Sequence, residues 1–238
     1  MAGIVYFVSG IDTGVGKTVA TGAMARFLLG RGISVATVKL VQTGCRGFSE
    51  DLEAHRAIMG VKPLPEDAEG LTAPQIFEFP ASPHLAASLE GRTVDTARIA
   101  DCVRRVAARY AVTLVEGAGG LAVPLTPSLL TVDFAASQGW PVILVCSGKL
   151  GALNHALLSI EALKTRNMPL AGVVYNYCPD ADPVIDADTP VMISHAMGRA
   201  GYAPSVVRLG RWDVTSGRET ALPDFTPIFR EALHESRD

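Results

Sequence analysis

The chain has 238 residues, of which 48% are hydrophobic and 19% are charged. That length is enough for one well-buried α/β domain and short for two, so we predict a single domain over residues 1–238. The formal net charge is −3, and no run of lysine and arginine forms a stripe that could neutralise a nucleic-acid backbone. Nucleic acid is therefore not expected as a partner.

The four cysteines, Cys45, Cys102, Cys146 and Cys178, lie far apart and form no C-x-x-C pair. Neither a zinc site nor a disulfide framework is expected, and the thiols should be reduced. The sequence begins with a strand pattern instead of a charged segment followed by an apolar signal stretch, and no uncharged apolar run approaches membrane-spanning length. We therefore expect a cytoplasmic protein with no membrane partner.

An apolar run over residues 5–8 breaks into a glycine-rich loop that ends in Gly16-Lys17-Thr18. Gly14 and Gly16 allow successive backbone N–H groups to surround an anion, and a helix that begins near Lys17 adds the positive end of its dipole. Lys17 would reach the β- and γ-phosphates of a nucleotide, and Thr18 supplies a hydroxyl where such loops usually hold Mg²⁺. The pattern predicts a loop that binds a nucleoside triphosphate.

This loop departs from the usual pattern G-x-x-x-x-G-K-[ST], which requires glycine at position 11. Ile11 occupies that position and Gly10 lies one residue too early, so we interpret the loop as a longer variant. An ordinary glycine-rich turn is the alternative. It is less favoured because Gly-Lys-Thr follows a buried strand, as a phosphate-binding loop requires.

A β-α-β unit follows from the spacing of apolar residues, with a helix over residues 18–29 and a second strand over residues 33–41. Parallel pairing of the two strands places Lys39 and Thr43 beside the phosphate loop, at the sheet edge where such folds bind ligands. A lysine at a strand end is often only a solvated charge. The apolar neighbours of Lys39 instead suggest a buried strand that delivers a cation into the ligand crevice.

Asp51 opens a helical pattern over residues 51–59 after a polar loop. It is either the N-cap of that helix or a carboxylate that faces a metal. Residues 61–78 are rich in proline and acidic side chains and are interpreted as an excursion on the surface. Two prolines make residues 79–84 a rigid loop, in which His84 is either a hydrogen-bonded structural histidine or a substrate contact.

A further apolar strand over residues 112–116 ends in Glu116 and continues into Gly117-Ala118-Gly119-Gly120, whose backbone can lie close to a ligand. A buried glutamate is costly without a partner. Its position resembles that of the acidic residue that assists the metal beside the phosphate loop in nucleotide-hydrolysing folds. A glycine-rich turn with a chance glutamate is the alternative.

The rest of the chain continues this alternation. Strands are expected over residues 140–147, 168–176 and 205–209, and helices over residues 93–110, 151–166 and 191–200, with a loop over residues 179–190. Free N–H groups at residues 151–154 would form an anion site. Asn176 carries an amide suited to reading a nucleobase edge, although a simple turn asparagine fits equally well. After Gly210 the sequence is polar, and no element can be placed in this tail.

Strands alternate with helices throughout, and the sequence contains no internal repeat or low-complexity segment. We predict an α/β fold of the P-loop NTPase-like type, with a doubly wound, mostly parallel sheet.

Several segments together resemble the dethiobiotin synthetase family in their order and spacing. They are Gly10-Ile11-Asp12-Thr13-Gly14-Val15-Gly16-Lys17-Thr18, Val38-Lys39-Leu40-Val41-Gln42-Thr43-Gly44, Ser82-Pro83-His84, Val115-Glu116-Gly117-Ala118-Gly119-Gly120 and Lys149-Leu150-Gly151-Ala152-Leu153-Asn154-His155. The resemblance covers roughly residues 4–176. It implies closure of 7,8-diaminopelargonic acid with CO₂ to dethiobiotin, ADP and phosphate, a Mg²⁺- and ATP-dependent step of biotin synthesis.

The resemblance also implies roles for individual residues. The catalytic residues would be Lys17 and Lys39, and the metal ligands Thr18, Asp51 and Glu116. Nucleotide would be bound by Gly14, Val15, Gly16, Lys17, Thr18, Val19, Asp51, Glu116, Gly117, Ala118, Gly119 and Asn176. Substrate would be bound by Thr13, Lys39 and Thr43 and, across a homodimer, by Gly151, Ala152, Leu153 and Asn154 of the partner subunit.

Two other functions remain as alternatives. A switch ATPase of the related deviant phosphate-loop class would use nucleotide to dimerise on membranes or DNA. Such proteins usually carry a second lysine early in the loop, where this chain has Ser9-Gly10-Ile11, and no basic amphipathic tail is evident. The other alternative is a different ATP-dependent ligase or amidotransferase of the same fold, because a fold alone does not set its chemistry.

Overall fold

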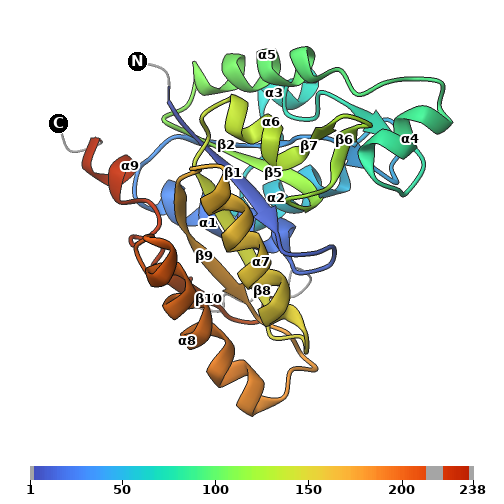
Figure 1. The fold of residues 1–238 in the computed structure, drawn as a ribbon. Helices are drawn as coiled ribbons and strands as arrows, with labels where there is room; N and C mark the ends of the chain where they lie inside the picture. The colour runs from blue at the N-terminus through green and yellow to red at the C-terminus, as the bar shows by residue number, and fades with distance from the viewer. Residues whose placement is uncertain (1–2, 213–221, 236–238) are drawn as a thin grey trace.

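The computed structural model describes residues 3–212 and 222–235 (Figure 1). Its strands are β1 (Ile4–Gly10), β2 (Val35–Lys39), β3 (Gln42–Thr43), β4 (Ile76–Phe77), β5 (Val112–Gly120), β6 (Pro124–Thr126), β7 (Leu129–Leu130), β8 (Val142–Ser147), β9 (Leu170–Asn176) and β10 (Val206–Leu209). Its helices are α1 (Lys17–Gly30), α2 (Glu50–Met59), α3 (Pro65–Ala68), α4 (Pro83–Leu89), α5 (Thr96–Ala107), α6 (Thr131–Ser137), α7 (Ala152–Thr165), α8 (Pro183–Ala200) and α9 (Arg230–Glu235). Within the described ranges, no helix is long and apolar enough to cross a membrane.

The central sheet has the strand order β10-β9-β8-β1-β5-β2, and all neighbouring strands in it are parallel. Every residue of β8 is buried, as expected for an interior strand that is covered on both faces. In Figure 1, α6 and α7 lie in front of the sheet and α1 lies behind it. The predicted doubly wound, mostly parallel sheet is confirmed.

The order of the strands brings distant segments to one edge of the sheet. β1 lies between β5 and β8, so the loop that follows β1 leaves the middle of the carboxyl edge. β2 pairs with β5 in a register that sets Lys39 opposite Glu116, and β1 sets Val8 opposite the same glutamate. The phosphate loop, the lysine and the glutamate therefore come from three adjacent strands.

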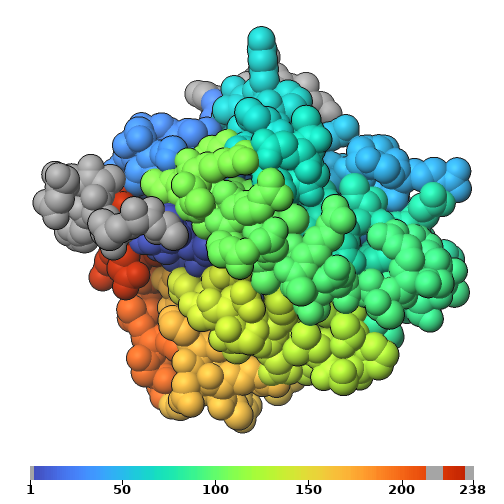
Figure 2. Space-filling view, turned by 90° about the horizontal axis from the view of Figure 1, so that it is seen from above, coloured from blue at the N-terminus to red at the C-terminus, as the bar shows by residue number. Residues whose placement is uncertain are grey.

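The expectation that residues 61–78 lie on the surface holds for most of residues 61–70 but is wrong for residues 71–77, most of which are buried. Thr72 is fully buried, and its carbonyl accepts the backbone N–H of Lys39 at 2.7 Å, so this segment covers the edge of β2. The acidic side chain of Glu66 is buried and paired, because it accepts a hydrogen bond from Arg109, just after α5, at 2.8 Å. In Figure 2 the cyan segment lies beside the green α5.

The rigid loop predicted for residues 79–84 ends early, because α4 begins at Pro83. Proline is well suited to the first turn of a helix, where the backbone N–H that it lacks would have no partner.

The loop predicted for residues 179–190 is present only over residues 179–182, because α8 begins at Pro183 and runs through Pro190. Pro190 has no N–H for the carbonyl of Asp186 four residues earlier. Arg208 of β10 donates to that carbonyl at 2.6 Å, so the acceptor that the proline leaves free is satisfied. This hydrogen bond from β10 helps α8 to accommodate a proline in its interior.

The polar tail expected after Gly210 is corrected by the described residues 222–235. Phe225 and Phe229 are fully buried there. The ring of Phe225 lies edge-on to Phe27 of α1 at 5.6 Å, and the ring of Phe229 lies edge-on to Tyr6 of β1 at 5.2 Å between centroids. This part of the tail therefore belongs to the hydrophobic core. The rest of the predicted tail, over residues 213–221 and 236–238, lies outside the described residues.

Candidate active site

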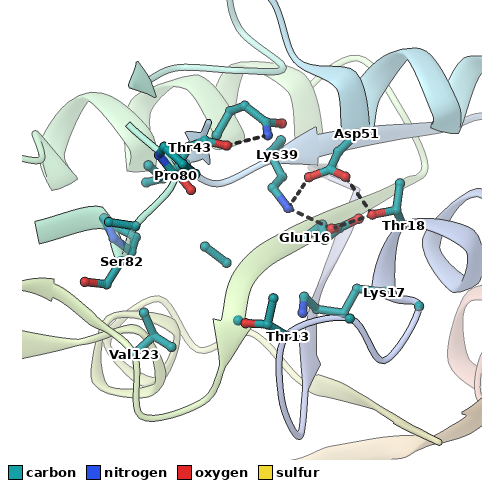
Figure 3. A pocket seen from close by; sticks show the side chains of 18 residues that line it. Thr13, Lys17, Thr18, Lys39, Thr43, Asp51, Pro80, Ser82, Glu116 and Val123 are labelled. Carbon is teal, nitrogen blue, oxygen red and sulfur yellow. Dashed lines mark hydrogen bonds and ion pairs between the residues drawn. The ribbon is translucent and has the colours of Figure 1, made fainter. Parts of the chain in front are cut away.

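A cleft of about 640 Å³ opens at the carboxyl edge of the sheet (Figure 3). One wall consists of the phosphate loop with Lys17 and Thr18, and the floor consists of Lys39 and Glu116. Pro80, Ser82 and Val123 form the opposite wall, and they come from the segments before α4 and β6. The cleft is therefore polar and charged on the loop side and largely apolar on the other.

The phosphate loop depends on left-handed backbone at two glycines. Gly14 has a φ of 73°, and Gly16, the N-cap of α1, has a φ of 85°. α1 begins at Lys17 without a side-chain cap, so the N–H groups of its first turn remain available to an anion. The ammonium of Lys17 donates to the loop's own carbonyl at Asp12, 3.1 Å away. Burial and the nearby Lys39 lower the pKa of Lys17, although Glu116 and Asp51 oppose that shift.

Lys39 bridges two carboxylates at the floor of the cleft. Its Nζ lies 2.5 Å from Oδ2 of Asp51 and 2.7 Å from Oε1 of Glu116. Burial alone would lower the pKa of Lys39, but the charges of Glu116 and Asp51 outweigh it, and the pKa is raised. The strand β2 is buried throughout, and the side chain of Lys39, which is 6% exposed, lines the cleft.

Glu116 is 1% exposed and uses both carboxylate oxygens. Oε1 accepts a hydrogen bond from Lys39 at 2.7 Å and lies 3.2 Å from the hydroxyl of Thr18, and Oε2 lies 2.7 Å from Nε2 of His55. Burial would raise the pKa of Glu116, but the charge of Lys39 and the hydrogen bond from His55 lower it strongly. The group is therefore a carboxylate at neutral pH. The structure contradicts the alternative of a chance glutamate in a turn.

Asp51 is not the cap of its helix. The N-cap of α2 is Ser49, whose hydroxyl accepts the backbone N–H of Leu52 at 3.3 Å. Asp51 is the second residue of the helix, and its Oδ1 accepts the hydroxyl hydrogen of Thr18 at 2.7 Å. Asp51 therefore places its carboxylate in the cleft, and Ser49 caps the backbone N–H groups at the helix start.

Thr18, Asp51 and Glu116 present hard oxygen donors of the kind that Mg²⁺ prefers. The Thr18 hydroxyl lies within 2.7 and 3.2 Å of the two carboxylates, so a small cation could reach all three side chains. Among residues 3–212 and 222–235, no group of three or more His, Cys, Asp and Glu side chains could hold a metal. One hydroxyl and two carboxylates fit Mg²⁺, which usually binds a few carboxylates together with water and substrate phosphates.

The structure brings eleven of the predicted site residues to the cleft: Thr13, Gly14, Gly16, Lys17, Thr18, Lys39, Thr43, Asp51, Glu116, Ala118 and Gly119. Lining residues that the sequence analysis did not select as site residues are Val41, Gln42, Pro80, Ala81, Ser82, Pro83 and Val123. For Pro80 to Pro83, the pair of prolines was a signal of rigid backbone but did not indicate which cavity it lines.

Asn176 does not line the cleft. Its Nδ2 donates to the carbonyl of Val15 at 3.1 Å, so the side chain supports the phosphate loop from outside the cleft. Val15, Val19 and Gly117, which were also expected to bind nucleotide, do not line the cleft either.

Gly151, Ala152, Leu153 and Asn154 also lie outside the cleft of their own chain. The next residue, His155, has its Nδ1 3.8 Å from Oδ2 of Asp12 in the phosphate loop. The start of α7 is thus near the loop, with Asn154 exposed.

His84 is half-buried and does not line the cleft. Its Nδ1 lies 3.1 Å from the hydroxyl of Ser82. Of the two interpretations of this histidine, the geometry supports the structural one.

Known proteins show what this chain is similar to. A family model described as an AAA domain matches residues 5–210. An ATP-dependent dethiobiotin synthetase of Pasteurella multocida is 44% identical over 203 residues, which cover 85% of this chain and 94% of that protein. Another, from Chlorobaculum tepidum, is 45% identical over 207 residues, with 87% of each chain covered. A third, from Haemophilus influenzae, is 47% identical over 180 residues, which cover 76% of this chain and 94% of that protein.

Among solved structures, the chloroplast FtsY of Physcomitrella patens has a TM-score of 0.54 at 17% identity, covering 98% of this chain and 66% of that one. A ParA family ATPase from Chlorobium tepidum has a TM-score of 0.51 at 14% identity, covering 98% and 90%. At such identities the similarity shows the P-loop NTPase-like fold alone. The sequence relatives are 44% and 45% identical over 85% and 87% of the chain, and the chain therefore belongs to the family of ATP-dependent dethiobiotin synthetases.

Proposed function

We propose that this protein uses Mg²⁺ and ATP to close 7,8-diaminopelargonic acid with CO₂, giving dethiobiotin, ADP and phosphate. The observation that carries the proposal is the convergence of Lys17, Thr18, Lys39, Asp51 and Glu116 in one cleft. The names of the relatives support ATP as co-substrate and dethiobiotin as product.

ATP would bind with its phosphates in the glycine-rich loop. Backbone N–H groups at the start of α1 provide neutral donors, and Lys17 provides the charge. The ammonium of Lys17 now bonds the carbonyl of Asp12, and it can exchange this neutral acceptor for a phosphate oxygen.

Thr18, Asp51 and Glu116 would hold Mg²⁺, which neutralises charge on the phosphates when bound. Lys39 bonds both carboxylates at 2.5 and 2.7 Å and limits their mutual repulsion before the nucleotide arrives. His55 occupies Oε2 of Glu116, so Oε1 is the oxygen that this residue directs toward the cleft.

The chemistry needs positioning and charge neutralisation more than covalent help from the protein. One substrate amine attacks CO₂ and loses a proton to give a carbamate. A carbamate oxygen then attacks the γ-phosphorus, ADP leaves, and a carbamic–phosphoric anhydride forms. The second amine attacks the carbonyl carbon, phosphate leaves and a proton is lost as the ring closes.

Lys39 would act as a cation in these steps. Its raised pKa keeps the side chain protonated at neutral pH, so it is suited to stabilise the carbamate and the transferred phosphoryl group and not to accept a proton. Thr13 and Thr43, at two sides of the cleft, would contact the substrate through their hydroxyls.

The active unit would be a homodimer in which the start of α7 of one subunit binds the substrate carboxylate held by the other. Asn154 is exposed at that helix start and lies outside the cleft of its own chain. Large apolar side chains are exposed on the contacting helices α7 and α8 and just before α7. They are Leu150, Leu158, Val184 and Val191. A partner subunit would cover them.

The reaction would take place in the cytoplasm. All four cysteines are free thiols in the structure, as is usual in a reducing compartment.

The proposal is tested by following ATP turnover and dethiobiotin formation with diaminopelargonate and bicarbonate supplied together or singly. Turnover should require both substrates, and the amount of ADP should match the amount of dethiobiotin. ATP hydrolysis that is indifferent to diaminopelargonate would contradict the proposal and favour a switch ATPase.

A further inference from the structure

Behind the cleft, a row of buried side chains leads to Glu116. His55 of α2 is fully buried, and its Nε2 lies 2.7 Å from Oε2 of Glu116. Its other nitrogen, Nδ1, lies 3.0 Å from the hydroxyl of Thr37 in β2. The same hydroxyl accepts a hydrogen bond from Nη1 of Arg56 at 2.6 Å. Asp67 fixes the guanidinium in turn, at 2.9 and 2.7 Å from Nε and Nη2.

The chemistry of donors and acceptors gives each of these bonds a direction. Arg56 can only donate, and the carboxylate of Glu116 can only accept. Among the residues that the structure describes, the Thr37 hydroxyl bonds Arg56 and His55, so its own hydrogen goes to Nδ1 of His55. Nε2 then carries the ring hydrogen and donates it to Glu116.

A histidine with hydrogens on both nitrogens does not fit this row. The Thr37 oxygen would then accept from both Arg56 and His55, and its own buried hydrogen would have no acceptor among the described residues. The bonds therefore run in one direction, from Arg56 through Thr37 and His55 to Glu116.

We propose that His55, with its ring hydrogen on Nε2, is a positioning residue that holds Glu116 with Oε2 turned away from the cleft and Oε1 turned into it. The inference rests on the proposed function, because it assigns Oε1 to the Mg²⁺ of the nucleotide complex. Thr18 marks that direction, since its hydroxyl lies 3.2 Å from Oε1. Without His55, Oε2 loses its donor and the carboxylate is free to turn.

Metal binding tests this role without requiring turnover. Mn²⁺ serves as the probe, because it accepts the same oxygen ligands and its free form gives an electron paramagnetic resonance signal. Mn²⁺ is titrated into the ADP complex of the full chain and of the variants His55→Leu and His55→Gln. His195→Leu, an exposed histidine of α8, is the control.

His55→Leu should raise the dissociation constant of Mn²⁺ about 10- to 100-fold, the usual cost of losing a partner of a metal ligand. His55→Gln retains an N–H donor and should lose less. His195→Leu should match the wild type, and ADP affinity in EDTA should be unchanged in all variants. Unchanged Mn²⁺ affinity in His55→Leu, or equal losses in the leucine and glutamine variants, would overturn the positioning role.

The tautomer gives a second readout that does not depend on the leucine variant being folded. Nitrogen-15 spectra of the wild-type imidazoles should show His55, identified by its absence in His55→Gln, with hydrogen on Nε2 alone. Hydrogen on Nδ1, or on both nitrogens, would overturn the inference. A wild type that forms no dethiobiotin would instead count against the proposed function, and the tautomer would remain to be judged independently.

Discussion

Lys17 and Lys39 share one cleft, yet their surroundings shift their pKa values in opposite directions. Burial dominates at Lys17, whose ammonium donates to the backbone carbonyl of Asp12, and its pKa is lowered. At Lys39 the same burial is outweighed by the carboxylates of Asp51 and Glu116. Lys17 is thus a cation whose charge is best stabilised by a bound phosphate, whereas Lys39 is stabilised by the protein itself.

This difference predicts different effects of removing each charge. Lys39→Ala should leave ATP affinity near the wild-type value, because Lys17 and the loop remain, and should lower kcat about 10²- to 10³-fold. Lys17→Ala should instead abolish detectable ATP binding. Calorimetric titration with ATP and the rate of dethiobiotin formation measure the two effects. Arg46→Ala, which removes an exposed positive charge outside the cleft, is the control. A near-normal kcat for Lys39→Ala would refute the role of Lys39 in the reaction.

The pair of Glu116 and Lys39 should also make stability depend on pH. The pKa of Glu116 is lowered by folding, so its contribution is present above its unfolded pKa of about 4.3 and is lost as pH falls toward the folded value. The pKa of Lys39 is raised, so its contribution is present below about 10.4 and is lost as pH rises through the folded value.

Urea unfolding in EDTA from pH 3 to 7 measures the acidic side. The wild type should lose stability as pH falls below about 4.3, and Glu116→Gln should lose less over the same range. Glu78→Gln, on an exposed ion pair with Arg46, is the matched control and should follow the wild type. Parallel curves for the wild type and Glu116→Gln would contradict the shifted carboxylate.

At the residue scale, the sequence could predict those side chains that stand in distinctive local segments. Thr18 follows a glycine-rich loop, and Lys39 and Glu116 each follow a run of apolar or β-branched residues. His55 gave no such signal, because it occupies a core-facing position of α2 and its partner Glu116 lies 61 residues further along the chain. Only the pairing of β2 with β5 brings that partner beneath the helix.

At the element scale, the phosphate loop depends on support from β9. Gly16 has left-handed backbone, and a Cβ on it would lie 1.8 Å from Nδ2 of Asn176. The amide of Asn176 holds the carbonyl of Val15 at 3.1 Å. The end of one strand thereby fixes the turn that precedes α1.

Gly16→Ala should therefore be more destabilising than positive φ alone requires, and it should weaken ATP binding. Gly139→Ala is the matched control, because Gly139 also has a positive φ, 69°, but a Cβ there meets nothing within 4 Å. The double variant Gly16→Ala/Asn176→Ala should recover part of the lost melting temperature by removing the clash. No recovery, or equal losses at the two glycines, would contradict the close packing of Asn176 on the loop.

Elements with a strong periodic pattern of apolar residues were predicted from the sequence. Elements that depend on contacts with distant parts of the chain were not. The amphipathic helix expected over residues 93–110 is present as α5. The start of α8 was missed because Pro190 suggested a loop, and the carbonyl it leaves free is satisfied by Arg208, 22 residues away from Asp186. The burial of residues 71–77 was missed because the acidic composition of residues 61–78 indicates a surface, while the ion pair between Glu66 and Arg109 spans 43 residues.

At the scale of the whole molecule, the C-terminal segment completes the core behind β1. The polar composition of this segment did not indicate its burial, because Phe225 and Phe229 are isolated aromatic residues in the sequence. Their partners Phe27 and Tyr6 belong to the first elements of the chain, so no local pattern could reveal the contact. The two chain ends are thus tied together on the side of the sheet that carries α1.

The opposite side of the sheet carries α7 (Figure 1), whose start is the expected binding site for the substrate carboxylate of a second subunit. A long aliphatic diamine acid must place its amines near Lys39 and its carboxylate at a distant anion site. In its own chain, the start of α7 does not line the cleft, although its N–H groups and Asn154 are suited to an anion. A second subunit would supply this site and cover the exposed leucines at 150 and 158.

A shared site predicts that two impaired variants can complement each other. Asn154→Ala should raise the KM for diaminopelargonate without changing ATP affinity, because its side chain lies outside the nucleotide cleft. Mixed with Lys39→Ala, it should form heterodimers in which one of the two sites has both groups intact, so that activity exceeds the sum of the separate variants. Ser159→Ala, further along α7, is the control and should give no such gain. A fully active monomer by analytical ultracentrifugation at assay concentration, or no gain despite proven subunit exchange, would rule out the shared site, because each chain would then carry every group that its substrate requires.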